Sequence, residues 1–324
     1  MTTSRFRKLL VPLDDSPLAE KTIAAAAGVA RRAGGVLHLA SVQPPAPRYP
    51  YTTAEIAHTL EREAKERVEG YLAAQAQSLA TCHGLEATCA VLGGSPAEAL
   101  ADYARTNAID LIVMTTHGRS GLGRFWLGSV ADRLLRCAAT PTLLLRSREQ
   151  PQHTDFRRVL VALDASPEGE AVLEPALALA ALYHEASCSL VQVIEPPFAI
   201  SPDLTVYPDQ VDATLIEQQQ ALARSSLDRL AERPRALGIA ATAHLPVSPA
   251  VGTQILELAR ELDSDLIAVG THGRHGAERL LLGSVADKVI RGATTPVLVV
   301  PIPSPAPRGV GRRHDHVFQR AARE

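Results

Sequence analysis

One segment of the chain occurs twice, and this repeat constrains the fold more than any other feature of the sequence. Residues 115–146 align with residues 270–301 without a gap, and the two segments are identical at 17 of 32 positions. Each copy follows a short aliphatic run that is typical of a buried parallel strand. Each copy then passes through a glycine-bearing loop into a segment with helical periodicity. The repeated unit is therefore a strand, a loop and a helix.

The glycines and serines of the repeated loop favour binding of phosphate. Nine residues separate two glycines in each copy, and a serine follows the second glycine. Glycine lets the backbone approach a ligand closely, and free N–H groups at a helix N-terminus attract anions. The alternative is that the glycines only form turns and the serines only cap helices. We favour phosphate because a turn does not require the His, Arg and Ser-Val-Ala-Asp that both copies contain.

The order of the other elements also repeats, which indicates two domains in a chain of 324 residues. In the first half we expect strands at 8–14, 36–42, 86–92, 111–114 and 142–145, and helices at 17–32, 53–82 and 96–105. In the second half we expect strands at 159–164, 190–194, 240–245, 266–269 and 297–300, and helices after Ser166-Pro167, at 209–233 and at 250–262. The expected domains are 1–150 and 151–302, with a polar linker at 147–155 and a disordered basic tail at 303–324.

This alternation of strands and helices predicts an α/β fold with parallel sheets and right-handed crossovers. In such sheets a ligand binds beyond the carboxyl ends of the strands, at the point where the strand order reverses. Asp14 and Asp164 end the first strand of each half, so we expect each to lie near one copy of the glycine loop.

The composition excludes several classes of function. A formal net charge of −2 and an aromatic content of 4% argue against a nucleic-acid partner. The sequence contains no apolar run of membrane-spanning length, and residues 1–7 lack a signal-peptide core, so we expect no membrane association and a cytoplasmic location. The four cysteines have no zinc-ligand spacing, which predicts small apolar fillers or free thiols in a reducing compartment.

These residues resemble the universal stress protein family, in the form with two such domains in tandem. The motif of the ATP-binding branch of that family is Gly, two residues, Gly, nine residues, then Gly-Ser or Gly-Thr. The segment that starts at Gly270 matches this motif in full, and Asp14 and Asp164 match the acid of the family. The resemblance covers nearly all of residues 7–147 and 157–301. It implies two flavodoxin-like (adenine nucleotide alpha hydrolase-like) domains, each a five-stranded parallel sheet with flanking helices.

The resemblance also implies ATP as the ligand and assigns residues to it. Phosphates would contact Gly118, Gly128, Ser129 and Val130 in the first domain, and Gly273, Gly283, Ser284 and Val285 in the second. Adenine and ribose would lie against Pro12, Leu13, Asp14 and Val42, or against Ala162, Leu163, Asp164 and Val193. Alternatively, Asp14 and Asp164 would ligate a phosphate-bound Mg²⁺.

Thr115 is the one departure from the motif, because it stands where the second domain has Gly270. Threonine strongly disfavours positive φ. If the site requires positive φ or a close approach at this position, the first domain would bind ATP more weakly than the second. If Thr115 only continues the strand, the two sites would be alike. We expect weaker binding in the first domain.

The residues do not decide between a regulator and an enzyme. His117 and His272 could act as an acid or base beside a phosphate. We favour a loop-shaping hydrogen bond, because neither copy shows an adjacent nucleophile, and we assign no catalytic residue. The roles of Arg119 and Arg274 stay open. The resemblance implies an ATP-dependent regulator of the stress response, and the alternatives are a slow ATPase, an adenylyl- or phosphoryl-transferring enzyme, or a scaffold with a degenerate pocket.

The last strand of each half predicts how the halves associate. Residues 142–145 and 297–300 are apolar, and the topology of the family places them at a sheet edge. An exposed apolar edge promotes aggregation, so proteins cover it. We therefore expect the two strands to pair with each other and to form a pseudo-twofold dimer within one chain. We also expect such chains to form homo-oligomers.

Overall fold

The computed structural model describes residues 5–43, 54–116, 127–146, 155–196, 199–200, 206–207, 213–271 and 282–302. The first half contains β1 (Lys8–Pro12), α1 (Pro17–Ala33), β2 (Val36–Gln43), α2 (Ala54–His83), β3 (Ala87–Gly93), α3 (Pro96–Thr106), β4 (Leu111–Thr115), α4 (Ser129–Cys137) and β5 (Thr142–Leu145). The second half contains β6 (Arg158–Ala162), a 3₁₀ turn (Gly169–Val172), α5 (Leu173–Ala180), β7 (Ser187–Val191), β8 (Ala199–Ile200), β9 (Val206–Tyr207), α6 (Ala213–Ala236), β10 (Ala240–His244), α7 (Val251–Glu261), β11 (Leu266–Gly270), α8 (Ser284–Gly292) and β12 (Val297–Val300).

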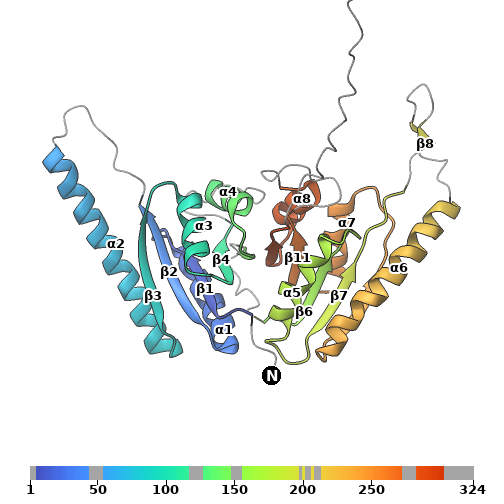
Figure 1. Cartoon of the computed structure of the whole chain (residues 1–324), viewed down its shortest axis with the longest axis horizontal. Coiled ribbons are helices and arrows are strands. Elements are labelled where there is room, and N and C mark those ends of the chain that lie inside the picture. The colour runs from blue at the N-terminus through green and yellow to red at the C-terminus, as the bar shows by residue number, and fades with distance from the viewer. Residues whose placement is uncertain are drawn as a thin grey trace, which may run out of the picture.

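The two halves share one ten-stranded sheet (Figure 1), in the order β10-β7-β6-β11-β12-β5-β4-β1-β2-β3. Within each half the strands are parallel, and the strand order reverses between β1 and β4 and between β6 and β11. At the centre β5 and β12 pair antiparallel, with Leu143 opposite Leu298. The predicted pairing of the two last strands is therefore confirmed, and it fuses the two five-stranded sheets into one.

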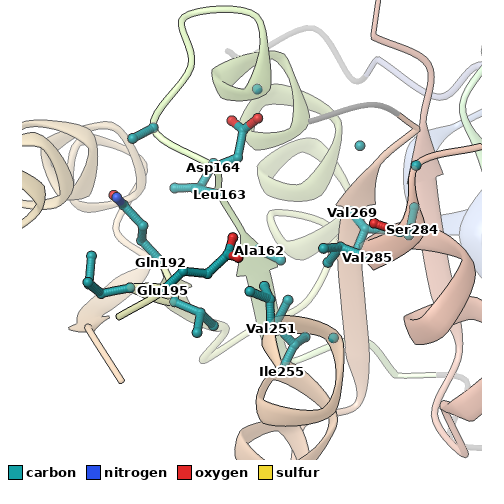
Figure 2. A pocket seen from close by; sticks show the side chains of 18 of the residues that line it. Ala162, Leu163, Asp164, Gln192, Glu195, Val251, Ile255, Val269, Ser284 and Val285 are labelled. Carbon is teal, nitrogen blue, oxygen red and sulfur yellow. The ribbon is translucent and has the colours of Figure 1, made fainter. Parts of the chain in front are cut away.

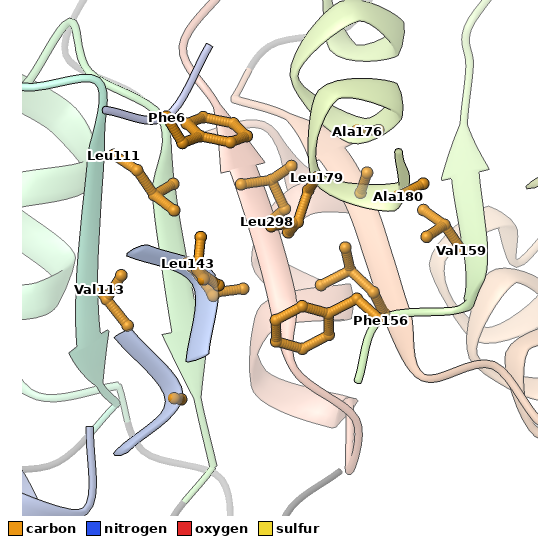
Figure 3. Close-up of a cluster of buried hydrophobic side chains, with 14 of the residues drawn as sticks. Phe6, Leu111, Val113, Leu143, Phe156, Val159, Ala176, Leu179, Ala180 and Leu298 are labelled. Carbon is orange, nitrogen blue, oxygen red and sulfur yellow. The ribbon is translucent and has the colours of Figure 1, made fainter. Parts of the chain in front are cut away.

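The helices form one layer on each face of this sheet. The buried apolar residues of α1, α2, α5 and α6 form one continuous cluster, and those of α3, α4, α7 and α8 form a second cluster on the opposite face. Both clusters run across the β5–β12 pair. Phe6 and Phe156 precede the first strand of each half and are completely buried. Figure 3 shows both rings together with Leu143 of β5 and Leu298 of β12.

Polar contacts also cross the boundary between the halves. Arg32 of α1 forms an ion pair with Asp155 at 2.8 Å, and its guanidinium lies over the ring of Tyr183. Arg146 follows β5, donates to the backbone oxygen of Ile290 in α8, and is buried deeply enough that its pKa is lowered to about 10. The boundary is thus a specific interface and not only an apolar contact.

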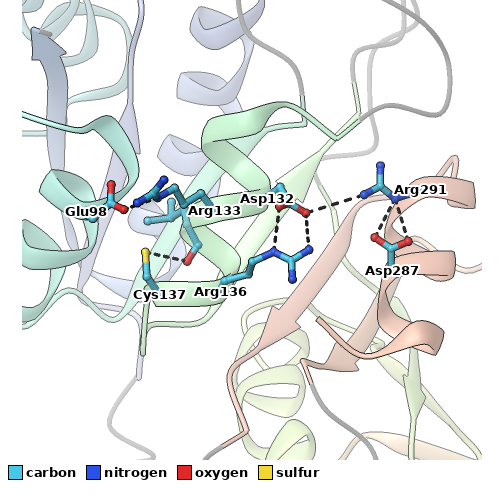
Figure 4. A network of polar contacts seen from close by, with 8 residues as sticks. Glu98, Asp132, Arg133, Arg136, Cys137, Asp287 and Arg291 are labelled. Atoms are coloured by element: carbon cyan, nitrogen blue, oxygen red, sulfur yellow. Dashed lines mark hydrogen bonds and ion pairs between the residues drawn. The ribbon is translucent and has the colours of Figure 1, made fainter. Parts of the chain in front are cut away.

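Helices α4 and α8 meet across the pseudo-twofold axis (Figure 4). Within each helix an aspartate accepts from an arginine one turn later, Asp132 from Arg136 at 2.9 Å and Asp287 from Arg291 at 2.8 Å. Arg291 also approaches Asp132 of the other half, with 3.9 Å between nitrogen and oxygen. The helices that begin at Ser129 and Ser284 are therefore in electrostatic contact with each other.

The side chains at one contact between neighbouring helices, α7 with α8 and α3 with α4, differ in size between the halves. In the second half a side chain at Gly292 would lie 2.5 Å from Leu256 Cδ1, so the leucine fills the space that the glycine leaves. The corresponding positions in the first half hold Cys137 and Ala101, where the larger residue is on the other helix. The larger residue of the pair thus lies on α7 in the second half and on α4 in the first.

The second half departs from the predicted elements at several points. Its first helix is delayed, because a 3₁₀ turn precedes α5. Strand β7 starts at Ser187 and not at residue 190, and Ile194 makes only an isolated bridge to Val247. The β8–β9 hairpin has no counterpart in the prediction. The proline-rich loop, most of the linker and the tail from residue 303 lie outside the described residues.

The central strand pair can be tested by placing a charge in it. Leu144 and Val299 are each 1% exposed, so Leu144→Asp or Val299→Asp would bury an unpaired carboxylate. We expect a loss of about 3–5 kcal/mol of unfolding free energy, with aggregation or separation of the halves. Urea denaturation and size-exclusion chromatography measure both effects. The control is Thr88→Asp in the outermost strand β3, where the residue is exposed. A soluble, compact and equally stable Leu144→Asp variant would contradict the pairing.

Candidate functional site

A cavity of about 1140 Å³ lies in the second half, at the carboxyl ends of β6 and β11. This is the point where the strand order of that half reverses, which is the usual ligand position in such sheets. The cavity brings together every predicted site residue of the second half that the structure describes. These are Ala162, Leu163, Asp164, Val193, Gly270, Gly283, Ser284 and Val285. Gly273 and His272 lie outside the described residues.

A tight turn after β6 fixes the carboxylate of Asp164. Its Oδ1 accepts from the backbone N–H of Ser166 at 3.0 Å and from the Ser166 hydroxyl at 2.6 Å. The same hydroxyl oxygen accepts from the N–H of Gly169 at 2.9 Å. A side chain at Gly169 would collide with Asp164 Oδ1, so the carboxylate or the backbone of this half would have to shift to admit one. The turn therefore holds Asp164 at the cavity with one oxygen already engaged.

The first half contains the same turn after β1. Asp14 Oδ1 accepts from the N–H and the hydroxyl of Ser16, at 3.2 and 2.6 Å, and the hydroxyl oxygen accepts from Ala19 N at 3.2 Å. The other predicted residues of this half lie at matching places in the fold. Pro12 ends β1, Leu13 follows it, Val42 is in β2, Thr115 ends β4, Gly128 precedes α4, and Ser129 and Val130 begin it. Gly118 and His117 lie outside the described residues.

The structure tests the interpretation that the repeated serines cap helices. The cap position of α8 is Gly283, with φ −58° and ψ 147°, and Ser284 is the first helical residue. Helix α4 begins in the same way at Gly128. No side chain caps either helix. The interpretation that Ser129 and Ser284 only cap helices is therefore wrong, and the first N–H groups of each helix have no intrahelical partner.

The start of α8 is held close to the end of β11. Gly283 N donates to Thr271 O at 2.7 Å, and Thr271 N donates to Val300 O at 3.0 Å. In the first half Gly128 N donates to Thr116 O at the same distance. These bonds place the positive end of each helix dipole beside the carboxyl end of the strand that precedes it. In the second half this end of the helix lines the cavity.

The structure explains the glycine at position 270 by the space around it and not by positive φ. It ends β11 in register with Val300 and is not among the described glycines with positive φ. A side chain at this position would collide with Ile302 Cδ1. Thr115 likewise continues β4, in register with Leu145. Neither position therefore has the positive φ on which strain at Thr115 would depend. The weaker binding expected of the first domain stays a prediction.

Gln192, Glu195 and Lys288 are among the cavity residues that the analysis of the sequence did not name. Figure 2 shows Gln192 and Glu195 on the side of the cavity opposite Ser284 and Val285, with Val251 and Ile255 at its base. Gln192 is 5% exposed. The sequence indicates these residues only through their closeness to Val193 and Ser284 along the chain. The residues that surround them in the cavity come from other elements.

The cavity offers oxygen ligands of the kind that Mg²⁺ prefers. Asp164 and Glu195 are the carboxylates that line it. Mg²⁺ is commonly held by one or two carboxylates together with phosphate oxygens and water, so these residues fit a phosphate-bound ion. Within the part of the chain that the structure describes, no three His, Cys, Asp or Glu side chains gather into a metal cluster.

Comparison with known proteins matches this architecture. A sequence model of the universal stress protein family matches residues 5–146 and again residues 155–301. The chain belongs to the universal stress protein family. The double match shows that this universal stress protein has the tandem form. None of its described helices is long and apolar enough to cross a membrane.

Universal stress proteins of similar length are related to this chain. A universal stress protein of Mycolicibacterium smegmatis is 31% identical over 263 residues, which are 78% of this chain and 82% of the relative. A universal stress protein of Mycobacterium tuberculosis is 28% identical over 316 residues, which are 91% and 95% of the two chains. The crystal structure of a universal stress protein from Archaeoglobus fulgidus has a TM-score of 0.65 at 21% identity and covers 92% and 97%. This structural likeness confirms the predicted fold.

The turn that holds Asp164 predicts the effect of a side chain at Gly169. Gly169→Ala would displace the Asp164 carboxylate, and we expect a loss of about 1–3 kcal/mol of unfolding free energy from overpacking. The matched control is Gly70→Ala in α2, where the added methyl group meets no atom within 4 Å. That change should be neutral or stabilising by about 0.5–1 kcal/mol. Equal effects of the two substitutions in urea denaturation would show that the turn tolerates a side chain.

Proposed function

We propose that this universal stress protein binds ATP, with Mg²⁺ on its phosphates, in the cavity of the second half. The observation that supports the proposal most strongly is the convergence of eight predicted residues on one cavity of about 1140 Å³. Cavities that bind small molecules typically measure about 300–1000 Å³, so this one is large enough for a nucleoside triphosphate.

Each part of the nucleotide has a suitable partner in the cavity. Leu163, Val193 and Val251 supply apolar contacts for the base. Asp164 supplies a carboxylate oxygen for ribose hydroxyls or for phosphate-bound Mg²⁺. The N-terminus of α8 and the hydroxyl of Ser284 supply donors for phosphate oxygens. Affinity for phosphate can thus come from backbone N–H groups and one hydroxyl.

We propose that the nucleotide regulates the protein. The titratable side chains that line the described part of the cavity are Asp164, Glu195 and Lys288, which include neither His nor Cys. The phosphate end of the site is also connected to the other half, because α8 carries the Arg291 that approaches Asp132 of α4. Occupancy of the cavity can therefore bias the interface between the halves.

The direct test is to identify what the full-length protein carries. Mass spectrometry of the purified protein, followed by incubation with ATP and Mg²⁺, separates the possibilities. Co-purified ATP that survives incubation supports a regulator. Turnover faster than minutes would establish an enzyme instead. Absence of both bound nucleotide and ATP uptake would contradict the proposal.

Removal of the Ser284 hydroxyl tests its role at the phosphate. We expect Ser284→Ala to weaken ATP binding about tenfold, because a charge-assisted hydrogen bond contributes on the order of 1.5–3 kcal/mol. The stability should change little, since Ser284 is not the cap residue of α8. The control is Ser248→Ala, which removes a hydroxyl that accepts from Ala250 N at 3.2 Å before α7. Unchanged affinity of folded Ser284→Ala in isothermal titration calorimetry would contradict the assignment.

Homo-oligomers of the pseudo-dimeric chain and a cytoplasmic location remain predictions from the sequence. Sedimentation equilibrium of the full chain, with and without ATP, measures its oligomeric state. A change in oligomeric state when ATP is added would show that the nucleotide also regulates assembly.

A further inference from the structure

Helix α8 brings a cation to the same cavity as its N-terminus. Lys288 lies four residues after Ser284, and both line the cavity. Residues with this spacing lie on one face of a helix, so the lysine stem follows the serine along the side of α8 that borders the site. The combination places a mobile ammonium group one turn from the proposed phosphate position.

Gly252 of α7 makes room for this lysine. A side chain at Gly252 would lie 2.7 Å from Lys288 Cγ and 2.9 Å from Lys288 Cβ. The stem of Lys288 therefore lies directly against the first turn of α7, in the space that the glycine leaves. Thr253 follows in α7 and also lines the cavity. Neither residue offers the lysine a negative partner.

The first half has the same helix pair with a different outcome. Its counterpart of Lys288 is Arg133, four residues after Ser129, and it faces α3, where Ala97 and Glu98 replace Gly252 and Thr253. Arg133 donates to Glu98 in an ion pair. Ser95 donates to the same carboxylate, and this bond is the main reason why the pKa of Glu98 is lowered. The cation of the first half is thus matched by an anion beside it.

Among the residues that the structure describes, no such anion pairs with the cation of the second half. Within the described part of the chain, the ion pairs of α8 involve Arg291, and Lys288 forms none. The positive charge of Lys288 is therefore available to a ligand in the cavity. A triphosphate is the part of a nucleotide that such a charge recognises, because ammonium groups bind phosphate through charge-assisted hydrogen bonds.

We propose that Lys288 binds the phosphates in the second-half cavity and makes this site selective for nucleoside triphosphate over nucleoside, whereas Glu98 withholds Arg133 from the equivalent role in the first half. The inference rests on the proposed function for the identity of the nucleotide. It gives the two halves unequal affinity for ATP through a charge difference and not through the backbone at Thr115.

The experiment titrates the full-length protein with ATP, adenosine and inorganic tripolyphosphate by calorimetry. We expect Lys288→Met to weaken binding of ATP and tripolyphosphate about tenfold, while adenosine binding changes less than twofold. Lys288→Arg should restore most of the ATP affinity, because it keeps the charge. The matched control is Arg133→Met, which should leave the tighter ATP site unchanged. The wild-type preference for ATP over adenosine should also decrease as salt is added.

A second variant moves the lysine without removing it. Gly252→Ala introduces the methyl group that would lie 2.7 Å from Lys288 Cγ, so the stem must shift. We expect this variant to lose ATP affinity in the same direction as Lys288→Met, with adenosine binding preserved. Preserved adenosine binding also shows that the cavity remains folded.

The outcomes separate this inference from the proposed function. A wild-type protein that binds ATP, with the same ratio of ATP to adenosine affinity after Lys288→Met, overturns the inference and leaves the function standing. A wild-type protein that ignores ATP but binds tripolyphosphate through Lys288 overturns the nucleotide assignment and supports the phosphate role of the lysine. An equal loss from Arg133→Met overturns the proposed difference between the halves.

Discussion

The antiparallel pairing of β5 with β12 is the interaction on which the rest of the structure depends. It gives each half a partner for its last strand, which would otherwise present an apolar edge to water. Because the buried clusters on both faces continue across this pair, each half completes its core with residues of the other. The halves are therefore a repeat in sequence but not two independent bodies in physical terms.

The same pairing determines how α4 and α8 are placed relative to each other. It brings α4 and α8 together at the pseudo-twofold axis, so the helices whose N-termini border the glycine loops are in contact through Asp132 and Arg291. Helix α8 therefore both lines the cavity of the second half and contacts the first half.

Much of this arrangement could be predicted from the sequence. The repeat, the aliphatic runs and the two strand-end acids predict two parallel α/β units, because these features are periodic or local. The edge position of the last strands, and most of the residues expected at the cavity, were implied by the resemblance to the family. The roles of Gly270 and Gly252 could not be predicted from the sequence. Gly270 leaves space for Ile302 and Gly252 leaves space for Lys288, and both contacts join residues that are remote in sequence. The late start of the first helix in the second half did have a local sign. Gly169 and Pro175 stand where the first half has Ala19 and Ala25, and proline is tolerated in the first turn of a helix but not in its interior.

In the second half Gly292 lies beside Leu256, whereas the first half has Cys137 and Ala101 at the corresponding positions. This difference limits how freely the helices of the two halves can be exchanged. If a recombination event copied α4 over α8, Cys137 would arrive opposite Leu256 in a space shaped for glycine. The reverse event would leave a gap between glycine and alanine. Exchange of α8 for α4 would thus require a matching change in the helix beside it.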